Sequence, residues 1–119
     1  MKSFTILIIL FSVITLSLFV VTPVTARTFL GSGGTTCGDY FQIKRVVPDA
    51  AKGIDLWLLG YVSGLNFMNY ASRKIDLLQQ QDSRDVLSFV SGYCSTNPEK
   101  TLNNAANEYW IQLSQPVGR

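Results

Sequence analysis

Residues 48–70 predict a long helix that is apolar on almost every side, and no other segment constrains the fold as strongly. The i, i+3, i+4, i+7 spacing of a buried stripe is followed by Ile54, Trp57, Leu58, Tyr61, Leu65 and Met68. The opposite side is not polar either, since it carries Leu56, Leu59, Gly60, Ser63, Gly64 and Phe67. A helix of this kind needs neighbours on several sides. The segment therefore predicts the central helix of an all-α bundle.

Two glycines, Gly60 and Gly64, lie four residues apart in this predicted helix. Each costs about 1 kcal/mol relative to alanine, because glycine loses more freedom on ordering. With Ser63 they share one face and remove the side chains that would hold another helix at the ordinary distance. We expect a neighbouring helix to cross closely here, so that leucine at either glycine would damage folding before binding. The alternative is a shallow groove for a partner.

A shorter helix is expected before the central one. Thr36 can cap its first turn with a hydroxyl, and Pro48 ends it because the residue before a proline avoids helical angles. Pro48 also suits the first turn of the central helix. After that helix, residues 71–81 are predicted to form a loop whose apolar side chains tuck under it: Ile75, Leu77 and Leu78.

Two further helices follow this loop. Asp82 and Asp85 have the spacing of a capping box, and the helix they begin would bury Val86, Phe89, Val90, Tyr93 and Cys94. Asn97 is expected to cap the last helix, with Pro98 in its first turn. That helix ends near Pro116 and carries Leu102, Ala105, Ala106, Tyr109, Trp110 and Leu113. Residues 37–115 therefore predict a compact bundle of about four helices.

The first 26 residues have the pattern of a secretory signal peptide. Lys2 precedes an unbroken apolar run, which ends in the small residues that a signal peptidase reads, so cleavage is expected near Ala26. The run also approaches the length of a membrane-spanning helix, and an uncleaved N-terminal membrane anchor is the alternative. Residues 27–36, rich in glycine and hydroxyl side chains, are predicted to be a flexible lead-in to the helical domain.

Both cysteines, Cys37 and Cys94, follow the predicted signal peptide. An even number of cysteines in an oxidising compartment favours a disulfide, and two cysteines allow a single intramolecular pairing. Closing so long a loop would stabilise the fold by roughly 4 kcal/mol on the chain-entropy model. Free or metal-bound thiols are the alternative, but the spacing offers no further ligands.

The chain contains no histidine. Catalysis by Ser-His-Asp or Cys-His and zinc sites built on histidine are therefore excluded. Asp49, Asp55, Asp76, Asp82 and Asp85 lack a partner base or a recognisable motif, so no catalytic residue, metal site or cofactor is predicted. Without Lys2 the chain has nine basic and eight acidic residues, a net charge of +1 that does not suit nucleic-acid binding.

Three patterns occur in order along the chain: Cys37-Gly38, then Trp57-x-x-Gly60-Tyr61-x-x-Gly64-x-Asn66, then Tyr93-Cys94-x-x-Asn97-Pro98. Together they resemble a group of small exported bacterial helical proteins, the HdeA-type acid-stress chaperones and the Rap and Tai immunity proteins, which neutralise cell-wall amidase toxins. The resemblance covers about residues 37–113. It implies a Cys37–Cys94 disulfide, an all-helical periplasmic fold and a function exercised by binding. Several such immunity proteins have more than one disulfide, and the acid chaperones are more polar.

The resemblance leaves the partner open. An immunity protein would bind a periplasmic toxin or enzyme. An acid chaperone would instead bind unfolded clients once its eight carboxylates are protonated and the basic groups repel one another. A second copy of the chain is a further option. In each case we expect the protein to be periplasmic or secreted, with partner contacts from Tyr61, Asn66, Tyr70 and Arg73.

Overall fold

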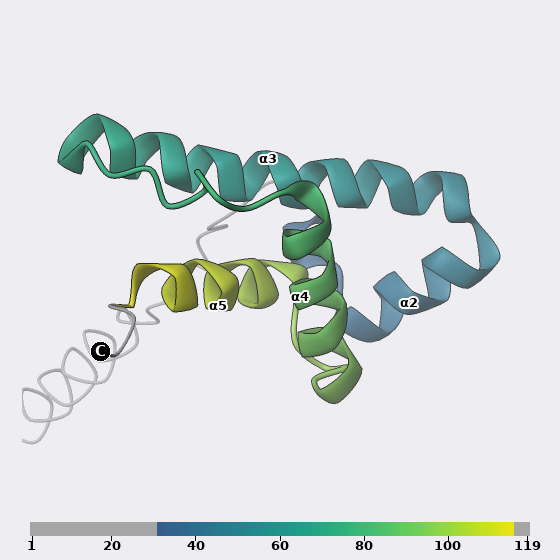
Figure 1. Ribbon diagram of the computed structural model, residues 1–119. Helices are drawn as coiled ribbons and strands as arrows, with labels where there is room; N and C mark the ends of the chain where they lie inside the picture. The colour runs from purple at the N-terminus through teal and green to yellow at the C-terminus, as the bar shows by residue number, and fades with distance from the viewer. Residues whose placement is uncertain (1–30, 116–119) are drawn as a thin grey trace, which may run out of the picture.

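The predicted central helix is the longest element among the residues that the structure describes. The computed structural model describes residues 31–115, so the predicted signal peptide and residues 27–30 lie outside the described residues. After a short 3-10 helix, η1 (Gly31–Gly34), the chain forms α2 (Cys37–Val46), α3 (Pro48–Arg73), α4 (Ser83–Thr96) and α5 (Leu102–Ser114). In Figure 1 the other three helices all lie to one side of α3. The predicted all-α fold of four helices is confirmed.

The core lies between α3 and the three shorter helices. Its buried side chains are Cys37, Tyr40, Ile54, Leu58, Val62, Val86, Val90, Cys94, Leu102, Ala105, Ala106 and Tyr109. The predicted disulfide between Cys37 and Cys94 is present, with the two Cα atoms 4.9 Å apart. It ties the first residue of α2 to the last turns of α4 and is itself buried in this core.

The part of the predicted lead-in that lies within the described residues is ordered. Thr36 forms an antiparallel bridge with Thr101, and the amide of Cys37 donates to the Lys100 carbonyl at 2.7 Å. Gly31 adopts a left-handed φ of 77° against the indole of Trp57, a conformation that glycine accepts without strain. Residues 31–36 are thus held by the α4–α5 connection and by α3, which the sequence alone did not predict.

Side-chain caps set most of the helix ends. Thr36 caps α2 as expected, and Asp82 with Asp85 forms the predicted capping box of α4. The prediction that Asn97 begins the last helix was wrong. Asn97 follows α4, and α5 begins instead after Thr101, which forms a second capping box with Asn104. The Thr36–Thr101 bridge fixes that position, so tertiary contact decides between two good capping residues.

The buried side of α3 differs from the predicted one. It is formed by Ala51, Ile54, Leu58 and Val62, whereas Met68 is 66% exposed and Trp57 and Tyr61 are half-buried. Gly60 and Gly64 lie on the exposed side. A Cβ built on either would meet no atom of residues 31–115 within 4 Å. The expected close crossing by another helix of the bundle is therefore wrong for the described residues, and the groove alternative remains.

A polar cluster joins α2 to α3. The buried Tyr40 hydroxyl donates to the Asp55 carboxylate at 2.5 Å and accepts from the Lys44 ammonium at 2.8 Å. Burial raises the pKa of Tyr40 above its ordinary value, and the hydrogen bond and the charge of Asp55 raise it further. The phenol therefore stays neutral and holds the two helices together. None of the helices in the described part of the chain is long and apolar enough to cross a membrane.

Candidate functional site

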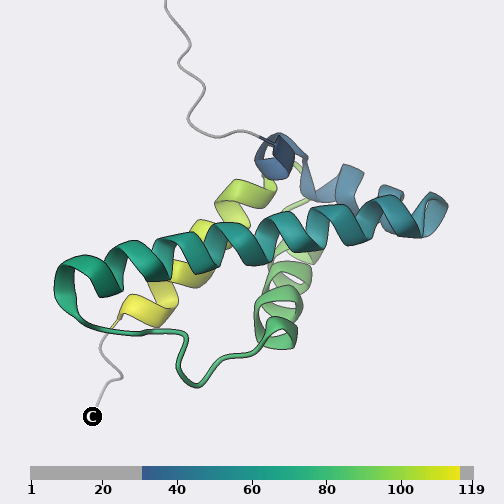
Figure 2. The ribbon, with the colours of Figure 1, turned by 90° about the horizontal axis from the view of Figure 1, so that it is seen from above.

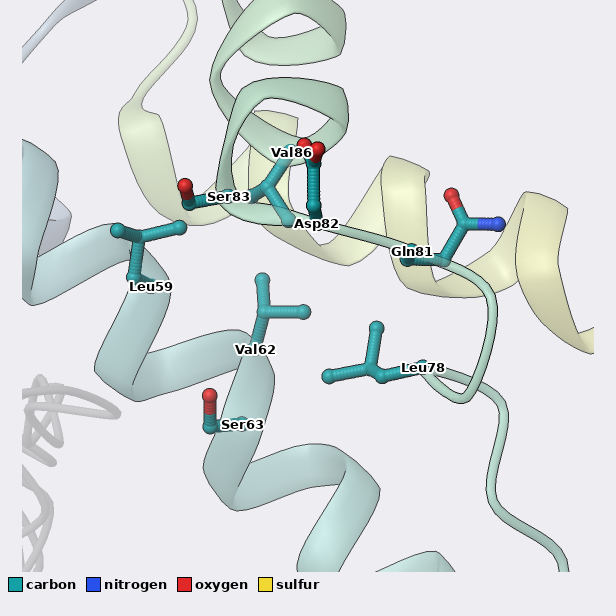
Figure 3. A pocket seen from close by; sticks show the side chains of 8 residues that line it. All are labelled: Leu59, Val62, Ser63, Leu78, Gln81, Asp82, Ser83 and Val86. Carbon is teal, nitrogen blue, oxygen red and sulfur yellow. The ribbon is translucent and has the colours of Figure 1, made fainter.

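A pocket opens where α3 meets the connection that leads into α4. Its volume is about 210 Å³, and it is lined by Leu59, Val62, Ser63, Leu78, Gln81, Asp82, Ser83 and Val86. We call it the α3–α4 pocket. Figure 3 shows the side chains of Leu59 and Val62 rising from α3 toward the start of α4, with Leu78 closing the space from the connection.

The pocket combines apolar walls with a polar rim. Four aliphatic side chains provide the walls: Leu59, Val62, Leu78 and Val86. The rim carries hydroxyls, an amide and one carboxylate, from Ser63, Ser83, Gln81 and Asp82. Apolar walls with a few polar groups at the edge are typical of binding sites, in which the polar groups fix the orientation of what enters.

Asn66 holds the connection that forms one wall of this pocket. Its side-chain amide donates to the Asp76 carboxylate at 2.8 Å, and its side-chain oxygen accepts from the Leu77 amide at 2.9 Å. Asp76 also accepts from the Leu78 amide at 3.0 Å. Asn66 was expected to contact a partner, but its polar atoms are occupied in ordering residues 76–78. Its role in this structure is to position the wall.

The N-terminus of α4 fixes the other side of the pocket. Asp82 accepts from the Arg84 and Asp85 amides, at 2.7 and 3.2 Å, and its second oxygen accepts from the Arg84 guanidinium at 2.8 Å. The guanidinium and then these backbone bonds hold the pKa of Asp82 below its ordinary value. The rim carboxylate is therefore ionised at neutral pH and already paired with a cation.

Gln81 is fixed from the core side. The Tyr109 hydroxyl donates to its side-chain oxygen at 2.9 Å. Burial raises the pKa of that tyrosine, and the nearby charges of Asp85 and Asp82 add to the shift. The phenol thus remains a donor at neutral pH. With Asn66 and the capping box, the connection and the helix start are held in place before anything binds, which lowers the entropic cost of binding.

Three of the remaining residues singled out from the sequence lie elsewhere. Tyr61 is stacked on Trp57 at 5.2 Å and donates to the Asn107 side chain at 3.0 Å, so it serves the contact with α5. Tyr70 is 51% exposed and Arg73 is exposed, both near the end of α3. None of the three lines the pocket.

Sequence reasoning identified Ser63, Leu78 and Val86 but not the pocket they help to form. It placed Leu78 and Val86 in contact with the bundle and Ser63 on a possible groove. Their meeting with Leu59 and Gln81 depends on the path of residues 74–82, which Asn66 determines. The signal available beforehand was a pair of polar residues, Asn66 in the central helix and Asp76 in the loop that follows it.

The described residues contain no group of three or more His, Cys, Asp or Glu side chains that could hold a metal ion. Comparison with protein-family models, with curated proteins and with solved structures found no match to this chain. The pocket can accept an apolar group, and its rim can form hydrogen bonds with the polar atoms that flank that group.

Proposed function

We propose that this chain is a non-enzymatic protein-binding module whose α3–α4 pocket receives one apolar side chain of a partner. The observation that carries the proposal is the size and lining of the pocket. At about 210 Å³ it is smaller than the roughly 300–1,000 Å³ of typical small-molecule sites. It is comparable with an apolar cavity of about 150 Å³ that accepts benzene. A single aromatic or branched aliphatic side chain matches it.

The rim supports recognition of a peptide segment. Side chains that anchor protein interfaces enter preformed pockets and are surrounded by polar contacts. The hydroxyls of Ser63 and Ser83 stand where they can pair with the backbone of the segment that carries the anchor. The Asp82 carboxylate is neutralised by Arg84, so it does not repel an uncharged segment.

The partner that best fits the other features is an exported enzyme, which this protein would inhibit as an immunity protein does. A disulfide in a small domain fits an oxidising compartment, where such enzymes act. The ordered Cys37, Gly60-Tyr61 and Cys94 patterns supply the resemblance to immunity proteins. The absence of a metal-ligand cluster from the described residues is compatible with binding but does not support it.

The test uses a variant that fills the mouth of the pocket. Ser83→Leu places an apolar side chain at the rim without altering the core, and Ser88→Leu makes the same change at an exposed position of α4 outside the pocket. The full chain is expressed, the exported protein is purified, and its inhibition of cell-wall hydrolases, including any that is encoded beside it, is measured by solubilisation of peptidoglycan. We expect inhibition by the wild type and by Ser88→Leu, and loss of inhibition with Ser83→Leu.

Two results would count against this proposal. One is a gene neighbourhood that encodes no exported hydrolase together with no inhibition of any cell-wall hydrolase tested. The other is equal inhibition by Ser83→Leu and by the wild type, which would place the partner elsewhere on the molecule.

A second candidate, an acid-activated chaperone, is favoured by the use of carboxylates as structural acceptors. Asp55 joins α3 to α2, Asp76 orders the wall of the pocket, and Asp82 and Asp85 cap α4. A protonated carboxyl group is a weaker acceptor than a carboxylate, so strong acid should loosen these contacts. The expected result is suppression of the aggregation of a test enzyme near pH 2–3, below the ordinary carboxyl pKa. Failure to protect the enzyme while the fold remains intact would eliminate this candidate.

A further inference from the structure

The side of α3 that faces away from the other helices carries large exposed apolar side chains. Leu56 is 69% exposed and Phe67 is 68% exposed, whereas residues of this kind are usually covered in a small domain. Gly60 and Ser63 lie between them, and because their side chains are small the surface is recessed at the centre of this face. In Figures 1 and 2 none of the other labelled helices covers this side of α3.

The residue types along this outer face of α3 are arranged symmetrically about its midpoint. Its members are Asp49, Leu56, Gly60, Ser63, Phe67 and Lys74, all of them exposed. They form three pairs, and the two members of each pair lie equally far from the point between Tyr61 and Val62. Each pair is matched in kind: an anion with a cation, an aliphatic with an aromatic side chain, and two of the smallest residues. A two-fold axis at that point would bring every pair together twice.

We propose that the outer face of α3 is a self-association surface, on which two copies of the chain pack with their α3 helices antiparallel. Leu56 of each copy then lies against Phe67 of the other, and Gly60 lies opposite Ser63 where the helices are closest. Small residues at the crossing allow the two backbones to approach. A fourth pair has the same symmetry: Tyr70, which is 51% exposed, faces Gly53, where a Cβ would meet no atom of the described residues within 4 Å.

The charges at the two ends of α3 favour an antiparallel arrangement of two helices, and they favour a second copy of the chain as the partner. Asp49 in the first turn of α3 faces Lys74, the residue that caps its other end, once at each end of the dimer. The Lys74 ammonium lies 5.7 Å from the centre of the Tyr70 ring, which places it over this face. Asp49 also pairs with Lys52 of its own helix at 2.8 Å. In a parallel dimer Asp49 would face Asp49 and Lys74 would face Lys74, so both attractions between the copies would be lost and the two lysines would repel each other. Antiparallel helix dipoles also attract one another.

The lengths agree with this arrangement. α3 has 26 residues and is about 39 Å long at 1.5 Å per residue. Two such helices that cross at an angle of about 20° stay close enough at their ends for aspartate and lysine side chains to meet. The surface shares Ser63 with the rim of the α3–α4 pocket, but none of its other members lines that pocket. The inference therefore does not depend on the proposed inhibitory function.

The oligomeric state of the purified protein tests the proposal, measured by sedimentation equilibrium over a range of concentrations. We expect the wild type to form dimers and Leu56→Glu to remain monomeric, because a charge would be buried against Phe67 of the other copy. Val46→Glu is the matched control, since Val46 is also 69% exposed but lies on α2. This control is expected to dimerise as the wild type does.

Charge reversal tests the register. Asp49→Lys alone and Lys74→Asp alone each replace two attractions by two repulsions, and each is expected to raise the dimer Kd roughly tenfold. The double variant Asp49→Lys/Lys74→Asp restores both pairs and should return the Kd toward that of the wild type. A monomeric wild type, or a Leu56→Glu variant that still dimerises, would overturn the proposal. Failure of the double variant to recover would overturn the antiparallel register.

Discussion

Alanine at Gly60 and at Gly64 is expected to stabilise the folded monomer. Both glycines lie well inside α3, and a methyl group at either would meet no atom of the described residues within 4 Å. The steric penalty is therefore absent, and what remains is the lower entropy of alanine in the unfolded chain. This amounts to about 0.5–1 kcal/mol for each substitution, or about 1–2 kcal/mol for both together.

The measurement is urea denaturation followed by far-ultraviolet circular dichroism. It is best made in the Leu56→Glu background, so that any change in dimerisation does not enter the free energy of unfolding. For a domain of this size each kcal/mol corresponds to a shift in Tm of about 4–8 °C. Gly92→Ala is the matched control, because Gly92 lies in α4 and is equally unobstructed; it should stabilise by a similar amount.

Gly31→Ala provides the opposite outcome. A Cβ at this left-handed residue would lie 2.8 Å from the Trp57 indole nitrogen, so this substitution should destabilise the protein. If Gly60→Ala instead lowered the free energy of unfolding by about 1 kcal/mol or more, while Gly92→Ala raised it, the reasoning would be refuted. Some part of the monomer would then be packed against the outer face of α3.

Three further outcomes follow from the contacts within the fold. Replacing Cys37 and Cys94 by alanine opens a loop of 57 residues and should lower the free energy of unfolding by about 4 kcal/mol, measured by urea denaturation. Tyr40→Phe removes the donor to Asp55 and should lower the free energy of unfolding by about 1–3 kcal/mol. The raised pKa of Tyr40 favours the neutral phenol in the folded state, so the wild type loses stability above pH 10, where the phenol of the unfolded chain ionises. The variant has no phenol and should lose less stability over this range. Because the pKa of Asp82 is lowered in the folded state, its carboxylate stabilises the fold above the unfolded carboxyl pKa of about 3.9, and this stabilisation is lost as the pH falls below that value. Asp82→Asn should therefore lose less stability than the wild type between pH 4 and pH 2. A Tyr40→Phe or Asp82→Asn variant with an unchanged pH profile would contradict the respective assignment.

The sequence predicted the elements whose ends depend on local chemistry. Thr36 and the Asp82–Asp85 pair satisfy amides of the helices they begin, and these bonds need only a few neighbouring residues. The cysteine pairing was predictable for a different reason, since two cysteines leave no choice. The last helix was misplaced because Asn97 and Thr101 are both good capping residues, and the choice between them is made by Thr36 across the bridge.

The candidate site was harder to predict than the fold. Its walls come from α3, from the connection at 74–82 and from α4, and the position of the connection follows from bonds made by Asn66. From the sequence, Asn66 is a polar residue on a helix and therefore suggests a binding role. The structure shows that its donor and acceptor face residues 76 and 77, so its polarity serves the shape of the site.

The glycines of α3 show where a local pattern stops being informative. Small residues four apart on one face predict that something approaches closely, and this follows from their geometry alone. The pattern does not say whether the approaching element belongs to the same chain. With α2, α4 and α5 on the opposite side of α3, an element that uses Gly60 must come from outside the described fold. Leu56 and Phe67, which are 69% and 68% exposed, are the residues that such an element would cover.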